Sequence, residues 1–206
     1  MQVERGGGDR RRIIASGWAC DLRILCDGRR QIFAFLLPGD TIDLARPQSL
    51  GACAVVALTQ LVVVGGAERG AVDPEHELER RNLEAAMDAT RQDRLYDHLV
   101  RIGRLTARER VIHLLLELRD RLDRVGLVKD ETFKIPVTQE VLADALGLSV
   151  VHINRTLREL RDQGLVVIKS GSVTLNHRAK LASAGCYEPS RAVTRAEPRT
   201  FRGASL

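Results

Sequence analysis

The chain has 206 residues, of which 44% are hydrophobic, and 32 Lys and Arg against 27 Asp and Glu give it a formal net charge of +5. This is enough for a hydrophobic core in one large or two small domains. The longest apolar runs, such as ALTQLVVV, fall well short of the ~20 residues of a membrane helix, and no apolar signal-peptide segment follows MQVERGGGDRRR. We therefore expect a cytoplasmic protein without a membrane partner.

The residues that carry metal or enzyme chemistry are dispersed. Four cysteines (Cys20, Cys26, Cys53 and Cys186) and five histidines form no paired C-x2-C or H-E-x-x-H spacing, so we expect free thiols, no metal and no cofactor. The chain also lacks G-x-S-x-G, P-loop and G-x-G-x-x-G motifs, and we expect no catalytic residues. The modest positive charge weakly favours an anionic partner.

The first third predicts a small β module of roughly four strands. WACDLRI (18–24) alternates apolar and polar residues, which is typical of a half-buried strand. Asp27-Gly28 then predicts a hairpin turn whose two central residues both have positive φ. QIFAFLL (31–37) is the next strand, and CAVVALTQLVVV (53–64) supplies two short strands or one long one.

A long charged helix is predicted from Pro74 to about Arg104, because Pro suits a first helical turn and the first Gly inside is Gly103. Its apolar residues recur at helical intervals and need a partner. They either cover the β module of the same chain or pair with the same helix of a second subunit. We favour pairing, because the stripe is longer than so small a module requires. The candidate dimerisation residues are Leu83, Met87, Leu95, Leu99 and Ile102.

Two further helical segments lead to a compact motif. TARERVIHLLLELRDRLDRVGL (106–127) is amphipathic and ends at Gly126. After the extended segment TFKIPV, Thr138 caps a helix that runs to Leu146, and Gly147 permits a sharp turn. Ser149 then caps a second helix, and LVVIKSGSVTL (165–175) is a hairpin that turns at Ser170-Gly171. This order predicts a helix-turn-helix with a β wing.

The second helix of this motif has a face suited to DNA. Ile153, Leu157 and Leu160 recur at inward spacing, so Val150, Val151, Asn154, Arg155 and Arg158 face outward with His152 near the edge. Arg can fork onto guanine, Asn can pair with adenine, and Val can pack on a thymine methyl. The alternative is an ordinary helical subdomain with solvated arginines. The combination of helices, Gly corner, cap and hairpin favours DNA binding.

The motif VTQEVLADALGLSVVHINRTLRELRDQGLV resembles the helix-turn-helix of the Crp/Fnr family of bacterial transcription regulators. GRRQIFAFLLPGD is similar to a hairpin of that family's cyclic-nucleotide-binding-type β-roll, and HLVRIGRLTARERVIHLLLELRDRL to its connecting segment. The resemblance implies an α+β chain with a partial N-terminal β-roll, a long dimerisation helix and a C-terminal winged helix-turn-helix. The expected boundaries are a disordered lead-in (1–12), the partial β-roll (13–72), dimerisation and connecting helices (73–125), the DNA-binding domain (126–185) and a flexible tail (186–206).

The resemblance also implies a homodimer that binds a two-fold symmetric operator in double-stranded DNA, with RNA polymerase as a further candidate partner. By position, Arg155 matches the base-reading arginine of the family. The full set of candidate DNA-binding residues is Thr138, Gln139, Ser149, Val150, Val151, His152, Asn154, Arg155, Arg158 and Lys169. Val151 stands where well-studied members have a glutamate, and a valine cannot accept a hydrogen bond from cytosine. The operator sequence of those members should therefore not be transferred.

The sensor part departs from nucleotide-binding members of the family. Their Gly-Glu and later Arg-Ser or Arg-Thr pairs, which hold the cyclic phosphate, correspond to Asp43 and Leu44 and to Gly51 and Ala52. Without an arginine a buried phosphate is poorly compensated, so we expect no cyclic-nucleotide dependence and leave the effector open.

The β-roll also lacks several of the family's first strands. Either the true start lies upstream, or the roll is reduced and leaves strand edges that need cover. The second case would suit a truncated, dimerising interaction protein that modulates intact family members.

Overall fold

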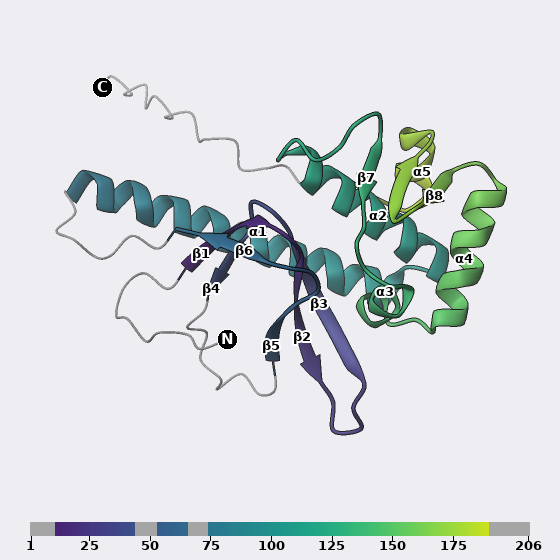
Figure 1. The fold of residues 1–206 in the computed structure, drawn as a ribbon, viewed down its shortest axis with the longest axis horizontal. Helices are drawn as coiled ribbons and strands as arrows, with labels where there is room; N and C mark the ends of the chain where they lie inside the picture. Colours follow the sequence, from purple (N-terminus) through teal and green to yellow (C-terminus); the bar gives the residue numbers. More distant parts are fainter. Residues whose placement is uncertain (1–10, 44–52, 66–73, 190–206) are drawn as a thin grey trace, which may run out of the picture.

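The computed structural model describes residues 11–43, 53–65 and 74–189. One long helix runs along the molecule, with the N-terminal strands across its side and a helical domain with a small sheet at its far end (Figure 1). Residues 190–206 of the expected tail (186–206), most of the lead-in and most of the linker after Gly65 lie outside the described residues. No helix in the described ranges is both long enough and apolar enough to cross a membrane.

Six strands form two three-stranded antiparallel sheets at the N-terminal end, in the orders β4-β1-β6 and β3-β2-β5. Their bounds are β1 Arg11–Ser16, β2 Ala19–Ile24, β3 Arg30–Leu36, β4 Thr41–Asp43, β5 Cys53–Ala57 and β6 Val62–Val64. The expectation of roughly four strands was too low. It missed β1, which begins inside the expected lead-in, and β4, whose three residues are too short for a periodic pattern.

Two details of the first hairpin correct the sequence prediction. β2 is buried on both faces over its first half, because Asp21, on its polar side, pairs with Arg91 of the long helix and is only 5% exposed. The turn has a positive φ at Gly28 alone (85°). The Gly28 N–H donates to the Leu25 carbonyl at 3.0 Å, and Leu25 N–H donates to the Arg29 carbonyl at 2.8 Å. This is a three-residue loop with a bulge, which requires only one left-handed residue.

The two connecting helices are α1 (Pro74–Arg104) and α2 (Ala107–Asp123). Thr106 and Glu109 form a capping box at the start of α2, in which each side chain accepts a hydrogen bond from the backbone N–H of the other residue. α2 was expected to be amphipathic, but it is buried nearly all round. Ile112 and Leu116, outside the predicted stripe, are 1% and 0% exposed, because the β-roll, α4 and α5 surround the helix.

The C-terminal part is a winged helix-turn-helix. It consists of β7 Thr132–Lys134, α3 Gln139–Leu146, α4 Val150–Asp162, β8 Val166–Lys169, β9 Ser172–Leu175 and α5 Arg178–Ala184, with sheet order β7-β9-β8. The sequence prediction did not include α5. Tyr187, placed in the expected tail, is 8% exposed, and its hydroxyl donates to Asp120 at 3.0 Å. The ordered domain therefore extends at least to this residue.

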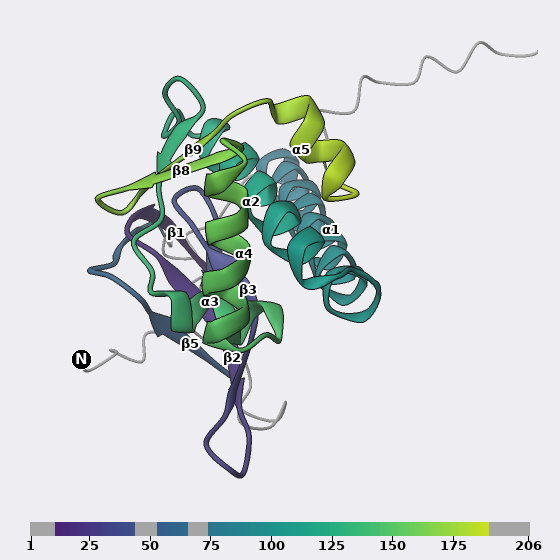
Figure 2. The ribbon, with the colours of Figure 1, turned by 90° about the vertical axis from the view of Figure 1, so that its right-hand side faces the viewer.

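One hydrophobic core joins the β-roll to the DNA-binding part. It runs from Trp18 and Phe35 through Leu116 to Leu146 and Leu160. α3 packs against β3 (Figure 2), and at their contact Arg30 forms an ion pair with Asp144 at 2.6 Å. The helix-turn-helix is thus fixed on the β-roll by packing as well as by the chain connection.

Candidate nucleic-acid interface

Local hydrogen bonds fix the two helices of the candidate interface. The Thr138 hydroxyl caps α3 by accepting from the Val141 N–H at 3.3 Å, and the Ser149 hydroxyl caps α4 by accepting from the His152 N–H at 3.2 Å. Between them Gly147 has a φ of 60°, a left-handed conformation that costs glycine little. The caps and the turn predicted from the sequence are confirmed, and they set the direction of α4.

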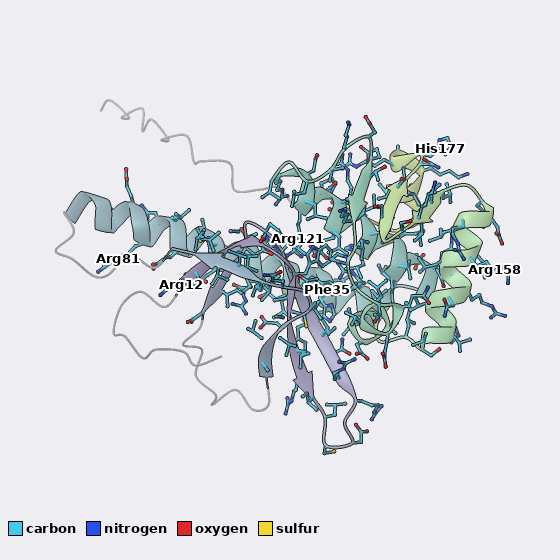
Figure 3. All side chains as sticks on the ribbon, viewed as in Figure 1. Arg12, Phe35, Arg81, Arg121, Arg158 and His177 are labelled. Carbon is cyan, nitrogen blue, oxygen red and sulfur yellow. The ribbon has the colours of Figure 1, made fainter. Side chains whose placement is uncertain are left out.

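The outward face of α4 is open to solvent. Ile153 and Leu160 are fully buried beneath it, whereas Val151 is 76% exposed. Figure 3 shows Arg158 pointing away from the molecule. The structure leaves every predicted DNA-contacting residue exposed: Thr138, Gln139, Ser149, Val150, Val151, His152, Asn154, Arg155, Arg158 and Lys169.

The charge of this face suits a polyanion. The first turn of α4 carries no acidic residue, so the partial positive charge of the helix N-terminus is available to a phosphate. Arg155 and Arg158 follow within the next two turns. Lys169 precedes the wing turn, in which Ser170 and Gly171 have φ of 50° and 74°, as in the tight two-residue hairpins predicted for this sequence.

The long helix α1 has two faces of opposite character. Over residues 94–101 the face toward the β-roll and α2 is polar, with Arg94 partly buried and His98 and Arg101 each 3% exposed. The opposite face is apolar and exposed, with Leu95 at 44% and Leu99 at 53%. A helix on the surface of a monomeric soluble protein normally buries its apolar face and exposes its polar face. The exposed apolar face of α1 is therefore a candidate site for a protein contact.

The other predicted dimerisation residues are placed differently. Leu83 is 58% exposed, whereas Ile102 is partly buried. Met87 is also partly buried and lines a cavity together with Leu36 and Thr41 of the same chain. The predicted stripe therefore covers more than one face of α1.

Sequence reasoning missed a buried polar cluster where the β-roll, α1 and α2 meet. Arg121 donates to Asp40 at 2.5 Å, to the Phe35 carbonyl at 2.6 Å and to Glu117 at 2.8 Å. Arg94 donates to the other oxygen of Asp40 at 2.7 Å. Arg101 pairs with Glu117. The available signal was the spacing of Glu117 and Arg121, which are four residues apart and next to Leu118 and Leu122 of the apolar stripe.

The cluster keeps its acids charged and its histidines neutral. Burial alone would raise the pKa of Glu117, but the positive charges of Arg101 and Arg121 outweigh burial and hold it at about 2. Burial, followed by the charge of Arg101, lowers the pKa of His98 and His113 to about 4. Arg101 Nε donates to Nδ1 of His113 at 3.2 Å, which requires a neutral acceptor nitrogen. The geometry and the pKa values therefore describe the same charge state.

The fold and the exposed, capped α4 define a winged helix-turn-helix DNA-binding protein. Residues 109–184 match the Crp-like helix-turn-helix domain. The chain is 33% identical over 161 residues to the nitrogen fixation regulation protein FixK of Bradyrhizobium diazoefficiens, covering 77% of this chain and 67% of the relative. It is 29% identical over 171 residues to the transcriptional activator protein FnrL of Cereibacter sphaeroides, covering 79% and 68%.

Solved structures give the same result. FixK2 from Bradyrhizobium japonicum is similar with a TM-score of 0.69 and 28% identity, over 84% of this chain and 85% of that one. A CRP-family transcriptional regulator from Thermus thermophilus gives a TM-score of 0.60 and 25% identity, over 88% and 91%. The chain belongs to the Crp/Fnr family and is a DNA-binding transcription regulator. The matches favour this function over the truncated interaction protein.

Proposed function

We propose that the chain acts in the cytoplasm as a homodimer joined along the outward face of α1. The observation that carries this proposal is the reversed polarity of α1, with a charged face buried in its own subunit and Leu95, Tyr96 and Leu99 exposed at 44–53% on the other side. Burying a leucine side chain contributes roughly 1.5–3 kcal/mol. A second α1 packed against the first would bury several such residues at once.

The dimer binds a two-fold symmetric operator, with one α4 in each of two successive major grooves about 34 Å apart. Arg155 reads a guanine and Asn154 is placed to pair with an adenine. The exposed hydroxyl, amide and ammonium groups of Thr138, Gln139, Ser149 and Lys169 suit phosphate and sugar contacts, which position the protein without reading sequence. RNA polymerase is the partner expected if the protein activates transcription.

Binding does not depend on a cyclic nucleotide. Asp43, on β4, stands at one position of the family's phosphate-binding pairs, while Leu44, Gly51 and Ala52 lie outside the described residues. None of these four side chains can donate the charged hydrogen bonds that a cyclic phosphate needs. The effector, if one exists, is of another chemical class.

The test is a selection of bound duplexes from a random pool at near-physiological salt, with and without cyclic AMP, together with the mass of the free protein by light scattering. We expect a two-fold symmetric motif, unchanged by the nucleotide, and the mass of two chains. A monomeric protein, or an asymmetric motif bound by one chain, would overturn the dimer. A symmetric motif that is enriched only with cyclic AMP would overturn the nucleotide independence.

A further inference from the structure

We propose that Val151 reads the 5-methyl group of a thymine in each operator half-site, an inference that rests on the DNA binding proposed above. Val151 has the largest exposed fraction, 76%, of the large apolar side chains that the structure describes as exposed. It lies on the outward face of α4, and Asn154 and Arg155, three and four residues further on, are exposed on the same face. The α4 face therefore contains one strongly exposed apolar contact among groups that form hydrogen bonds.

The position of this side chain is well fixed. Val151 is the second residue of α4, and the cap from Ser149 to the His152 N–H closes the turn that contains it. A β-branched side chain in a helix keeps one strongly preferred χ1 rotamer. Val151 can therefore present its methyl groups to a ligand with little loss of conformational entropy.

The chemistry of the major groove selects thymine as the base. In the major groove thymine presents its O4 acceptor and a 5-methyl group, whereas cytosine presents the donor of its N4 amino group and no methyl group. Val151 has no acceptor, so a cytosine there would lose water from its N4 amino group without gaining a partner. A thymine methyl group packed on Val151 would instead remove apolar surface of both groups from water.

The helix geometry places this thymine relative to the base read by Arg155. Residues four apart lie on the same face of a helix and about 6 Å apart along its axis. Base pairs along one strand are separated by about 3.4 Å. The thymine should therefore lie within about two base pairs of the guanine whose recognition is lost in Arg155→Ala.

The experiment starts from the selected operator and replaces each thymine in turn by deoxyuridine, which removes only the methyl group. Removing one buried methyl-sized contact should weaken binding about fourfold for one half-site and about fifteenfold for both. The loss should occur at one thymine per half-site, at the predicted distance. Cytosine at that position should bind more weakly still, and 5-methylcytosine should recover part of the loss.

Two variants assign the effect to Val151. Val151→Ala should bind thymine and deoxyuridine operators equally, whereas Val64→Ala, an exposed valine on β6, should keep the difference. Val151→Glu should come to favour cytosine, because its carboxylate can accept from N4. Deoxyuridine losses that persist in Val151→Ala, no loss at any thymine, or a half-site without a thymine in reach would overturn the inference.

Other results would contradict the proposed DNA binding by α4 and not only the role of Val151. If Arg155→Ala binds the selected operator as tightly as the parent, or if no motif is selected, the placement of α4 in the groove is wrong. If the motif is selected and Arg155→Ala loses it, a flat deoxyuridine scan rejects the role of Val151 alone.

Discussion

Glu117→Gln should strongly destabilise the fold, because it removes the acid that two buried arginines share. Glu117 pairs with Arg101 and accepts from Arg121 at 2.8 Å, and the two arginine side chains are only 4% and 6% exposed. The glutamine has nearly the same shape but no charge. Arg101 would be left buried with His113, a neutral acceptor, while Arg121 would keep Asp40.

The expected cost follows from the electrostatics of the cluster. Glu117 has a pKa of about 2 in the folded protein and an ordinary value of 4.5. At 1.36 kcal/mol per pKa unit, this difference corresponds to about 3 kcal/mol of stability at neutral pH. Breaking a buried ion pair by removing one partner typically costs about 3–5 kcal/mol, which is a similar free energy.

The assay is urea unfolding followed by far-UV circular dichroism at pH 7 and at pH 3.5, with the exposed Glu159→Gln as the matched control. A folded-state pKa below the unfolded one stabilises fully above pH 4.5, and this stability is lost as the pH falls toward 2. The difference in unfolding free energy between the parent and Glu117→Gln should therefore be smaller at pH 3.5 than at pH 7. A cost below about 1 kcal/mol at pH 7, or a difference in unfolding free energy that is the same at both pH values, would show that the charge of Glu117 does not stabilise the fold.

The other predictions concern DNA binding, assembly and packing. Arg155→Ala should cost about 1–3 kcal/mol on the operator and little on random DNA, measured by fluorescence anisotropy; equal losses on both would contradict base reading. Leu95→Glu should give monomers with weak operator affinity, and an unchanged mass by light scattering would show that this face does not join two subunits. The lowered pKa values of His98 and His113 should make stability fall from about pH 6.5 toward pH 4, in thermal melts across that range, because the unfolded state binds more protons there. Gly17→Ala should lower the melting temperature, because a Cβ there would lie 2.1 Å from the Gln60 carbonyl oxygen; an unchanged melt would mean that this loop can move aside.

The helix-turn-helix could be predicted because its signals are local. Thr138, Gly147 and Ser149 each act on backbone groups within a few residues, so the sequence alone defines the caps and the turn. The exposed face of α4 follows from the helical spacing of its buried residues. Residue contacts with DNA stay predictions, since they depend on the operator.

The parts that sequence reasoning missed depend on distant segments. Asp40 and Arg121 are 81 positions apart, and nothing in either neighbourhood indicates that they meet. The burial of Asp21 likewise depends on Arg91, 70 positions away. α2 was predicted to be amphipathic, but tertiary pairing places its Asp120 and Arg121 in the interior.

The packing of α3 against β3 has a consequence for affinity. A DNA-binding domain held only by a flexible connection would lose rotational freedom each time it bound DNA. Here the shared core and the Arg30–Asp144 ion pair hold α4 in one orientation before DNA arrives. In a dimer, the two α4 helices would be held at a nearly constant separation. More of the energy of the DNA contacts would then remain as binding free energy.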